Sequence, residues 1–138
     1  MSFEHRVTVR FNEVDRAGIA FFARVFEYCH ATFEEMLMAT PGSLTSVFDD
    51  GGWGMPLVHS EADFKSPMRM GDRLLVKMTI ERLGKSSITF HYTLTGPDER
   101  LCATVRLVHA LVDLESFTPC GIPEELRTNL DGLGLLPA

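Results

Sequence analysis

The chain has 138 residues, 45% of them hydrophobic, and a formal net charge of −6. This length suits one domain with one core, so we expect residues 1–138 to form a single domain. The basic residues are scattered, which excludes the positive patch of a nucleic-acid-binding protein. No signal peptide is recognisable and no stretch approaches the roughly 18 apolar residues of a membrane span, so we expect a cytoplasmic protein without a membrane partner.

The cysteines and histidines lack the spacing of a metal site. Cys29, Cys102 and Cys120 give an odd count without a C-x-x-C pair, which argues against both a disulfide framework and a zinc site. The five histidines are dispersed along the chain. We therefore expect reduced thiols and no bound metal ion.

The first predicted elements are a strand and a long helix. Residues 6–11 alternate between apolar and polar, which predicts a half-buried strand with Val7, Val9 and Phe11 facing the core. Apolar residues then recur at steps of three and four as far as Leu37, which is the period of one helix face. We expect a core helix of about nineteen residues, about 28 Å long.

The turn between this strand and this helix is the first candidate site. Asp15 lies just ahead of the helix, and Gly18 can take a positive φ and lets another molecule approach the backbone. The first amides of a helix have no intrahelical partner and lie at the positive end of its dipole, so they can polarise a carbonyl oxygen. A carboxylate beside such amides suits acyl transfer, although Asp15 could also simply cap the turn.

The helix is expected to end at the Pro and Gly of residues 40–43, and residues 44–48 can add a helical turn. Residues 49–56 form a glycine-rich loop, in which Trp53 is either an anchor or the wall of a ligand site. We favour the anchor, because an indole ring brings a large apolar surface to a loop that has few other hydrophobic residues.

The remainder of the chain is predicted to form strands joined by tight turns. The strands are expected over residues 57–64, 74–83, 87–95 and 101–114. Their spacing is that of a meander, which favours an antiparallel sheet. The tail has a possible helical turn over residues 123–130 and is expected to be peripheral. One long helix against one curled antiparallel sheet is an α+β arrangement.

Four separated motifs follow one another in a specific order along the chain. They are V-D-R-A-G-I-A-F-F before the helix, P-L-V-H-S-E-A-D-F-K-S-P in the second strand, G-D-R-L-L-V at the third and G-K-S-S at a hairpin. Together they resemble hot-dog-fold acyl-CoA thioesterases of the 4-hydroxybenzoyl-CoA thioesterase type, over about residues 5–120. The second and third motifs also look like the 1,4-dihydroxy-2-naphthoyl-CoA thioesterases. The resemblance implies the hot-dog fold, a sheet wrapped around one long helix.

The resemblance implies roles for four residues in hydrolysis of the thioester. Asp15, in the turn with Gly18, would be the catalytic carboxylate, either as nucleophile through a mixed anhydride or as general base for water. The amide of Phe22 would polarise the thioester carbonyl. His59 would orient a substrate group or water, although a strand histidine is more often structural.

The resemblance also implies how the substrate is held. Arg82, Lys85 and Ser86 at the hairpin would bind the CoA phosphates, and no separate cofactor is expected because CoA is part of the substrate. Phe22 stands where the branch of the Tol-Pal envelope system usually has a histidine, so the chain looks closer to the branch that acts on aromatic acyl-CoA. Members share each active site between two subunits, so we expect a homodimer or homotetramer.

The expected function is hydrolysis of an aromatic acyl-CoA to the free acid and CoA. Aromatic residues at the helix start and Trp53 would form flat apolar walls, and His59 or Ser60 would bind a polar ring substituent. An aliphatic acyl-CoA or acyl-carrier-protein thioesterase and a non-catalytic acyl-CoA-binding protein are the alternatives. Asp15 argues against the last, since binding alone needs no carboxylate. The remaining acids, Glu13, Glu27 and Glu34, are expected to face solvent.

Overall fold

The computed structural model describes residues 1–39 and 52–137, so the predictions for residues 40–48 lie outside the described residues. The elements in chain order are β1 (Phe3–Thr8), the 3₁₀ turn η1 (Phe11–Glu13), α1 (Arg24–Ala39), β2 (Trp53–Gly54), β3 (Leu57–Phe64), β4 (Arg73–Leu83), β5 (Ser87–Thr95), the 3₁₀ turn η3 (Pro97–Glu99), β6 (Leu101–Ala110), β7 (Val112–Asp113) and α3 (Glu124–Gly132).

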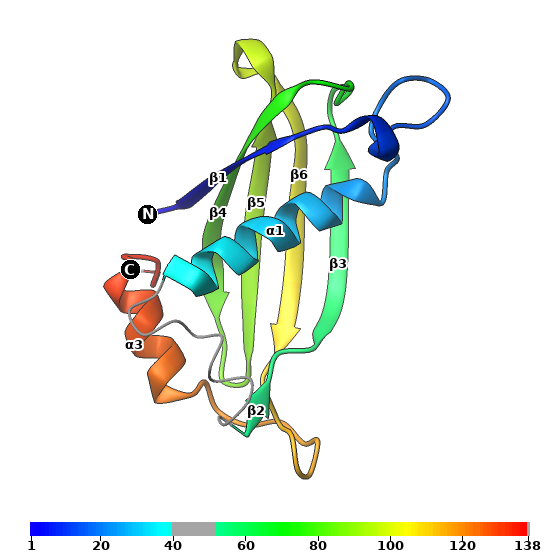
Figure 1. Cartoon of the computed structure of the whole chain (residues 1–138). Helices are drawn as coiled ribbons and strands as arrows, with labels where there is room; N and C mark the ends of the chain where they lie inside the picture. The colour runs from blue at the N-terminus through cyan, green and yellow to red at the C-terminus, as the bar shows by residue number, and fades with distance from the viewer. Residues whose placement is uncertain (40–51, 138) are drawn as a thin grey trace.

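One five-stranded sheet, with strand order β1-β4-β5-β6-β3, packs against α1. All of its strand pairs are antiparallel. Figure 1 shows α1 crossing one face of the curved sheet, and the helix contacts β1, β4 and β6. The expected α+β arrangement of one long helix and one antiparallel sheet is therefore confirmed.

The core lies between α1 and the inner face of the sheet. Every second residue along β5 is buried, and the same alternation runs through most of β4 and β6, because successive side chains of a strand point to opposite faces. The buried residues of α1 recur at helical spacing and are Val25, Tyr28, Cys29, Thr32, Phe33, Met36 and Leu37. This two-layer packing holds both the start and the middle of α1 at fixed positions over the sheet.

The first strand ends earlier than predicted. β1 stops at Thr8, and Phe11 is 81% exposed, so the prediction that Phe11 faces the core was wrong. Val9 is instead held by the backbone before β4, where its amide donates to the Asp72 carbonyl at 2.9 Å. The chain then leaves the sheet, because the Arg10 amide donates to the Glu13 carboxylate at 2.8 Å and closes a 3₁₀ turn.

The long helix begins later than predicted and has 16 residues rather than nineteen. Its expected first turn is pulled into extended pairing, because the Ala20 amide donates to the Met68 carbonyl at 2.7 Å and the Phe21 amide to the Glu13 carbonyl at 2.9 Å. These partners are distant in sequence or lie across a turn, so helical periodicity carries no signal of them.

The last predicted strand is divided in two. β6 ends at Ala110, and β7 pairs with β2 in a separate two-stranded sheet. The break occurs at Leu111, whose amide donates to the Ser86 carbonyl at 2.9 Å. Trp53 in β2 is buried and belongs to the core, as expected for an anchor.

The tail is part of the core, so the prediction that it is peripheral was wrong. Leu126 and Leu130 of α3 and Leu135 after it are all buried. β1 pairs only with the first half of β4, as far as Met78. The tail lies beside the other half, where residues 81–83 and Arg127 line one cavity. The apolar residues of the tail therefore cover the end of β4 that β1 leaves unpaired.

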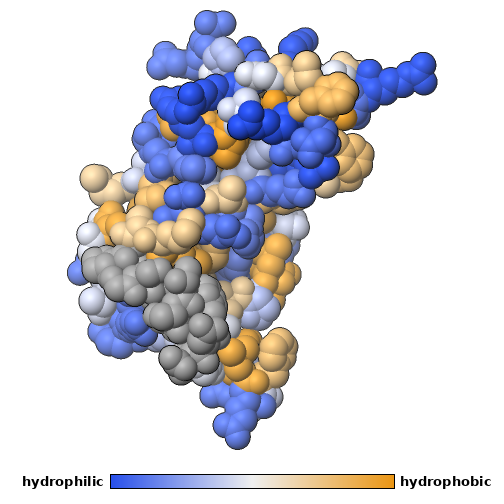
Figure 2. Space-filling view, viewed as in Figure 1, coloured by the Kyte–Doolittle hydropathy of each residue, from blue (hydrophilic) through white to orange (hydrophobic). Residues whose placement is uncertain are grey.

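The strand β3 forms an edge of the sheet, paired with β6 on one side. Most of its residues are exposed, including the large apolar side chains Leu57, Val58 and Phe64. Figure 2 shows hydrophobic residues along the side of the molecule where β3 runs. An exposed apolar edge strand offers unpaired backbone groups to a second chain.

Candidate active site

The turn that carries Asp15 is a small closed loop. Its backbone pairs across itself, with the Asp15 amide donating to the Ile19 carbonyl at 2.9 Å and a bridge between Val14 and Ala20. Gly18 has φ 79°, the left-handed conformation expected for it, and the space beside its Cα is open. Glycine is therefore favoured here by its backbone conformation, and the loop leaves the main chain accessible.

The Asp15 carboxylate is exposed and only partly engaged. Its Oδ1 accepts a hydrogen bond from the Ala17 amide at 2.8 Å, which is the turn-capping contact weighed as the alternative role. Within residues 1–39 and 52–137, Oδ2 accepts no hydrogen bond. Asp15 can therefore hold the turn through one oxygen while the other stays available for chemistry.

Free amides lie at the start of α1. The Arg24 amide donates to the Phe21 carbonyl at 2.8 Å and the Val25 amide to the Phe22 carbonyl at 3.3 Å. The amides of Phe22 and Ala23 donate to no acceptor in the part of the chain that the structure describes, and Phe22 is exposed. Two donors at the positive end of the helix dipole are thus available to a carbonyl oxygen.

A partly buried hydrogen bond joins the Asp15 turn to α1. The Tyr28 hydroxyl donates to the Glu13 carboxylate at 3.0 Å, and burial together with this hydrogen bond raises the pKa of Tyr28. Glu13 also accepts the Arg10 amide, so it is a half-buried structural acid rather than the solvent-facing one expected. Glu27 is exposed as expected and pairs with Arg24 at 2.7 Å.

His59 and Asp15 lie on different parts of this chain. His59 is exposed on β3, with Nε2 at 3.2 Å from the Glu61 carboxylate. The Asp15 turn pairs instead with the chain that follows β3, through a bridge between Ile19 and Arg69. His59 lies five positions before the end of β3, about 17 Å along the strand from that end.

Arg82, Lys85 and Ser86 lie together at the β4–β5 hairpin, also far from Asp15. The Asp15 turn contacts the segment immediately before β4, where the Met70 amide donates to the Gly18 carbonyl at 3.4 Å. The hairpin lies at the other end of β4, about 33 Å away along the strand. Asp15 and the hairpin therefore lie toward opposite ends of β4.

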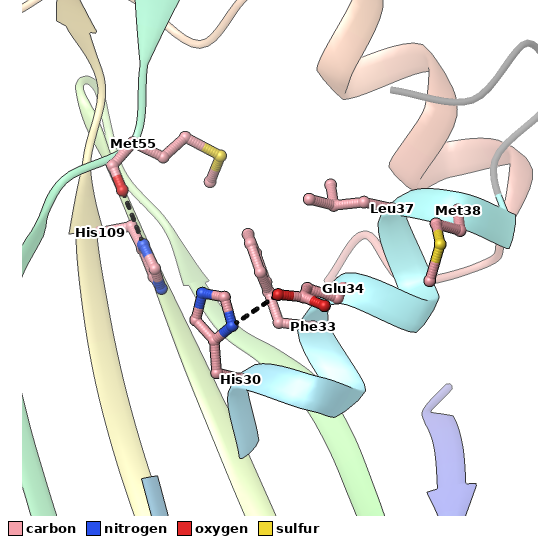
Figure 3. A pocket seen from close by; sticks show the side chains of 7 residues that line it. All are labelled: His30, Phe33, Glu34, Leu37, Met38, Met55 and His109. Carbon is pink, nitrogen blue, oxygen red and sulfur yellow. Dashed lines mark hydrogen bonds and ion pairs between the residues drawn. The ribbon is translucent and has the colours of Figure 1, made fainter. Parts of the chain in front are cut away.

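A cavity that the sequence did not predict opens between α1 and the sheet. It has a volume of about 370 Å³ and is lined by His30, Phe33, Glu34, Leu37, Met38, Met55 and His109. Figure 3 shows His30, Phe33 and Glu34 of α1 facing Met55 and His109 across it. A second cavity of about 240 Å³ shares four of these residues and adds Phe26, Leu57, Tyr92 and Leu107.

Two histidines face this space in different states of burial. His109 is buried, stacks on Phe33 at a centroid distance of 5.0 Å, and has Nδ1 at 2.9 Å from the Met55 carbonyl. Burial lowers the pKa of His109, so the ring is neutral at pH 7 and donates through Nδ1. His30 is exposed, with Nδ1 at 3.3 Å from the Glu34 carboxylate, and Glu34 is exposed as expected.

One sequence signal pointed to this cavity. His109 continues the inward alternation of Val105 and Leu107 along β6, so a polar ring falls on a face that is otherwise apolar. His30 and Phe33 lie on successive turns of α1, with Phe26 one turn before them. What spacing alone does not reveal is that these strand and helix positions meet.

The described residues contain neither a candidate metal site nor a helix that could span a membrane. Within residues 1–39 and 52–137, no group of three or more His, Cys, Asp or Glu could hold a metal ion. Nor does any described helix have the length and apolar character needed to cross a membrane. The cysteines in the described ranges are free.

Comparison with known proteins places this geometry among thioesterases. The profile of the Thioesterase-like superfamily matches residues 9–130. A 1,4-dihydroxy-2-naphthoyl-CoA hydrolase of Nostoc punctiforme is 34% identical over 91% of this chain and 84% of its own length. A Synechococcus protein of the same name is 34% identical over 93% and 89%. The crystal structure of a 1,4-dihydroxy-2-naphthoyl-CoA thioesterase from Synechocystis superposes with a TM-score of 0.87 at 27% identity, covering 99% and 100% of the two chains.

Proposed function

Because the chain belongs to the thioesterase-like superfamily, we propose that it hydrolyses the CoA thioester of an aromatic acid to the free acid and CoA. The hot-dog thioesterase family expected from the four sequence motifs is thereby confirmed. Relatives named 1,4-dihydroxy-2-naphthoyl-CoA hydrolases support the aromatic acyl group. The observation that carries the proposal in the structure is a row of side chains leading from the free amides of α1 into the cavity.

This row has the spacing of one helix face. Phe26, His30 and Glu34 are four residues apart in α1, so their side chains follow one another along the helix at steps of about 6 Å, and Phe22 lies two residues before the helix begins. Phe26 and His30 line the smaller cavity. A thioester whose carbonyl oxygen accepts the Phe22 amide can therefore extend its acyl group past Phe26 toward His30.

Asp15 would supply the reacting carboxylate in one of two ways. As nucleophile, it attacks the carbonyl carbon, CoA leaves as thiolate, and water hydrolyses the resulting mixed anhydride to regenerate Asp15. As general base, it takes a proton from water, which attacks the same carbon. In both cases the Phe22 amide would stabilise the oxyanion. If water attacks the Asp15 carbon of the anhydride, a single turnover in ¹⁸O-labelled water places the label in Asp15 and an unlabelled Asp15 oxygen in the product, whereas the general-base route labels the product.

A panel of substrates tests the acyl group. We expect kcat/KM for dihydroxynaphthoyl-CoA and hydroxybenzoyl-CoA to exceed that for hexanoyl-CoA and palmitoyl-CoA by about tenfold or more, because a rigid ring fills the apolar space between Phe26, Phe33 and Met55 at little entropic cost. Thiol release is followed spectrophotometrically. A preference for either aliphatic thioester over both aromatic ones would favour the aliphatic alternative, and absence of hydrolysis would favour the non-catalytic one.

The CoA phosphates are proposed to bind to the hairpin of a neighbouring subunit. Arg82, Lys85 and Ser86 lie together, and the protein is acidic overall, so this hairpin is a local cationic spot for an anionic ligand. Its distance from Asp15 within one chain supports a site shared between two copies. The exposed edge of β3 is the surface best suited to join them.

Subunit mixing tests this shared site. Asp15→Asn and the double variant Arg82→Ala/Lys85→Ala carry their defects in different halves of the proposed site. When the two are unfolded and refolded together, hybrids contain one site with both halves intact, so activity at low substrate concentration should exceed that of either variant refolded alone. Mixing them after separate refolding is the control. An active monomer in sedimentation, or no gain on co-refolding, would contradict the shared site.

A further inference from the structure

The hydroxyl of Tyr92 lacks a partner inside the core. Tyr92 lies on β5, is 0% exposed and lines the cavity of about 240 Å³. Within residues 1–39 and 52–137, its hydroxyl is the buried side-chain polar atom without a hydrogen bond. Burial raises its pKa well above the usual value, so it is a neutral phenol. A buried hydroxyl is expensive to leave unpaired, and the cavity that Tyr92 lines has room for a ligand that could supply its partner.

The same cavity contains an unused acceptor. His109 Nδ1 faces the Met55 carbonyl and must carry the proton, which leaves the lone pair on Nε2. Nε2 makes no hydrogen bond to a described residue. Tyr92 and His109 lie on adjacent strands, with His109 opposite Ile88, four positions before Tyr92 on β5. They can therefore contact two different points of one ligand.

The walls define the chemistry of that ligand. Phe26, Phe33, Met55 and Leu107 are apolar, so a charged group would be desolvated without compensation, whereas a flat ring would be well packed. Nε2 needs a donor, and the phenol can give or accept one hydrogen bond. A hydroxyl group on an aromatic ring satisfies both, but a saturated acyl chain satisfies neither.

We propose that the Tyr92 hydroxyl and His109 Nε2 determine specificity by binding ring hydroxyl groups of the aromatic acyl substrate. This inference rests on the proposed function and names the groups that recognise its substrate. It moves the polar contacts from His59 and Ser60, which lie on the exposed edge strand β3, to two buried groups on β5 and β6.

Tyr92→Phe tests the proposal by removing one oxygen atom. Because that oxygen is unpaired in the free protein, the thermal unfolding midpoint should stay the same or rise. The kcat/KM for 1,4-dihydroxy-2-naphthoyl-CoA should fall about tenfold, while that for 2-naphthoyl-CoA should be unchanged. His109→Asn can still donate to the Met55 carbonyl but lacks Nε2, and should lower the same ratio between the two substrates. Thr89→Val is the control, since it removes a hydroxyl from the opposite face of the same strand and should leave the ratio unchanged.

The outcomes are separable from those of the proposed function. If the wild type does not prefer the hydroxylated thioester, or if Tyr92→Phe and His109→Asn both keep its preference, the inference is overturned while thioester hydrolysis stands. If the wild type hydrolyses neither thioester, the proposed function fails, and calorimetric binding of the free acids decides the inference. Wild type should then bind 1,4-dihydroxy-2-naphthoate about tenfold more tightly than 2-naphthoate, and Tyr92→Phe should not; equal affinities in the wild type would overturn it.

Discussion

Asp15→Asn should lower kcat for acyl-CoA hydrolysis by at least about two to three orders of magnitude, the scale expected when a nucleophile or general base is lost. The amide oxygen of Asn can still accept the Ala17 amide, so the turn should persist. What disappears is the negative charge on the free oxygen, and with it both routes of attack. The measurement is kcat on the best substrate of the panel, with thermal unfolding recorded for the same preparation.

Asp131→Asn provides the matched control for this variant. Asp131 is an exposed carboxylate in α3, remote in sequence from the proposed site, and its loss changes the net charge by the same amount. It should hydrolyse the substrate at the wild-type rate. If a folded Asp15→Asn protein did the same, Asp15 would have only its capping role and the catalytic carboxylate would have to be sought elsewhere.

Leu130→Ala should lower the free energy of unfolding by about 2–5 kcal/mol. Leu130 is 0% exposed and joins α3 to the core that fills the space between α1 and the sheet. Truncation leaves a cavity and removes apolar area that the tail contributes over the unpaired end of β4. A loss of this size is a large part of the 5–15 kcal/mol typical of a domain. Chemical denaturation measures it.

Thr128→Ala in the same helix is the control, because Thr128 is exposed and its side chain makes no hydrogen bond within the described residues. It should change the unfolding free energy by less than about 0.5 kcal/mol. A loss below about 1 kcal/mol for Leu130→Ala would mean that the tail adds little to the core and that its removal would leave the rest of the fold intact.

Strands whose limits are set locally were predicted well. The bounds of β3 and β5 agree with the predicted 57–64 and 87–95, because alternation stops at turn-forming residues on both sides. Where the limit is set by a distant partner, the prediction was wrong. β1 stops at Thr8, and Val9 bonds instead to the backbone before β4. β6 ends at Ala110, because the amide of the next residue, Leu111, donates to the Ser86 carbonyl.

The same distinction applies to the candidate site: residues adjacent in sequence could be predicted, and residues brought together by the fold could not. Asp15 and Gly18 could be proposed from a few adjacent residues, and the positive φ of Gly18 agrees with the prediction. Tyr92 and His109 were missed as a pair because they lie on different strands, and only the register of β5 with β6 brings both to one cavity. The proposed pairing of Asp15 with the hairpin needs a second copy of the chain, which no spacing within one sequence describes.

The side chains that follow one another along α1 would limit the length of the acyl group that the proposed site accepts. In the proposed binding mode, a thioester fixed at the helix start would extend past Phe26, then His30, then Glu34, in increments of four residues, about 6 Å. A bulkier residue at a position close to the helix start would shorten the longest acyl group accepted. A smaller residue at a position farther along the helix would lengthen it. The catalytic turn need not change in either case, so substrate length can evolve by single substitutions while the chemistry stays constant.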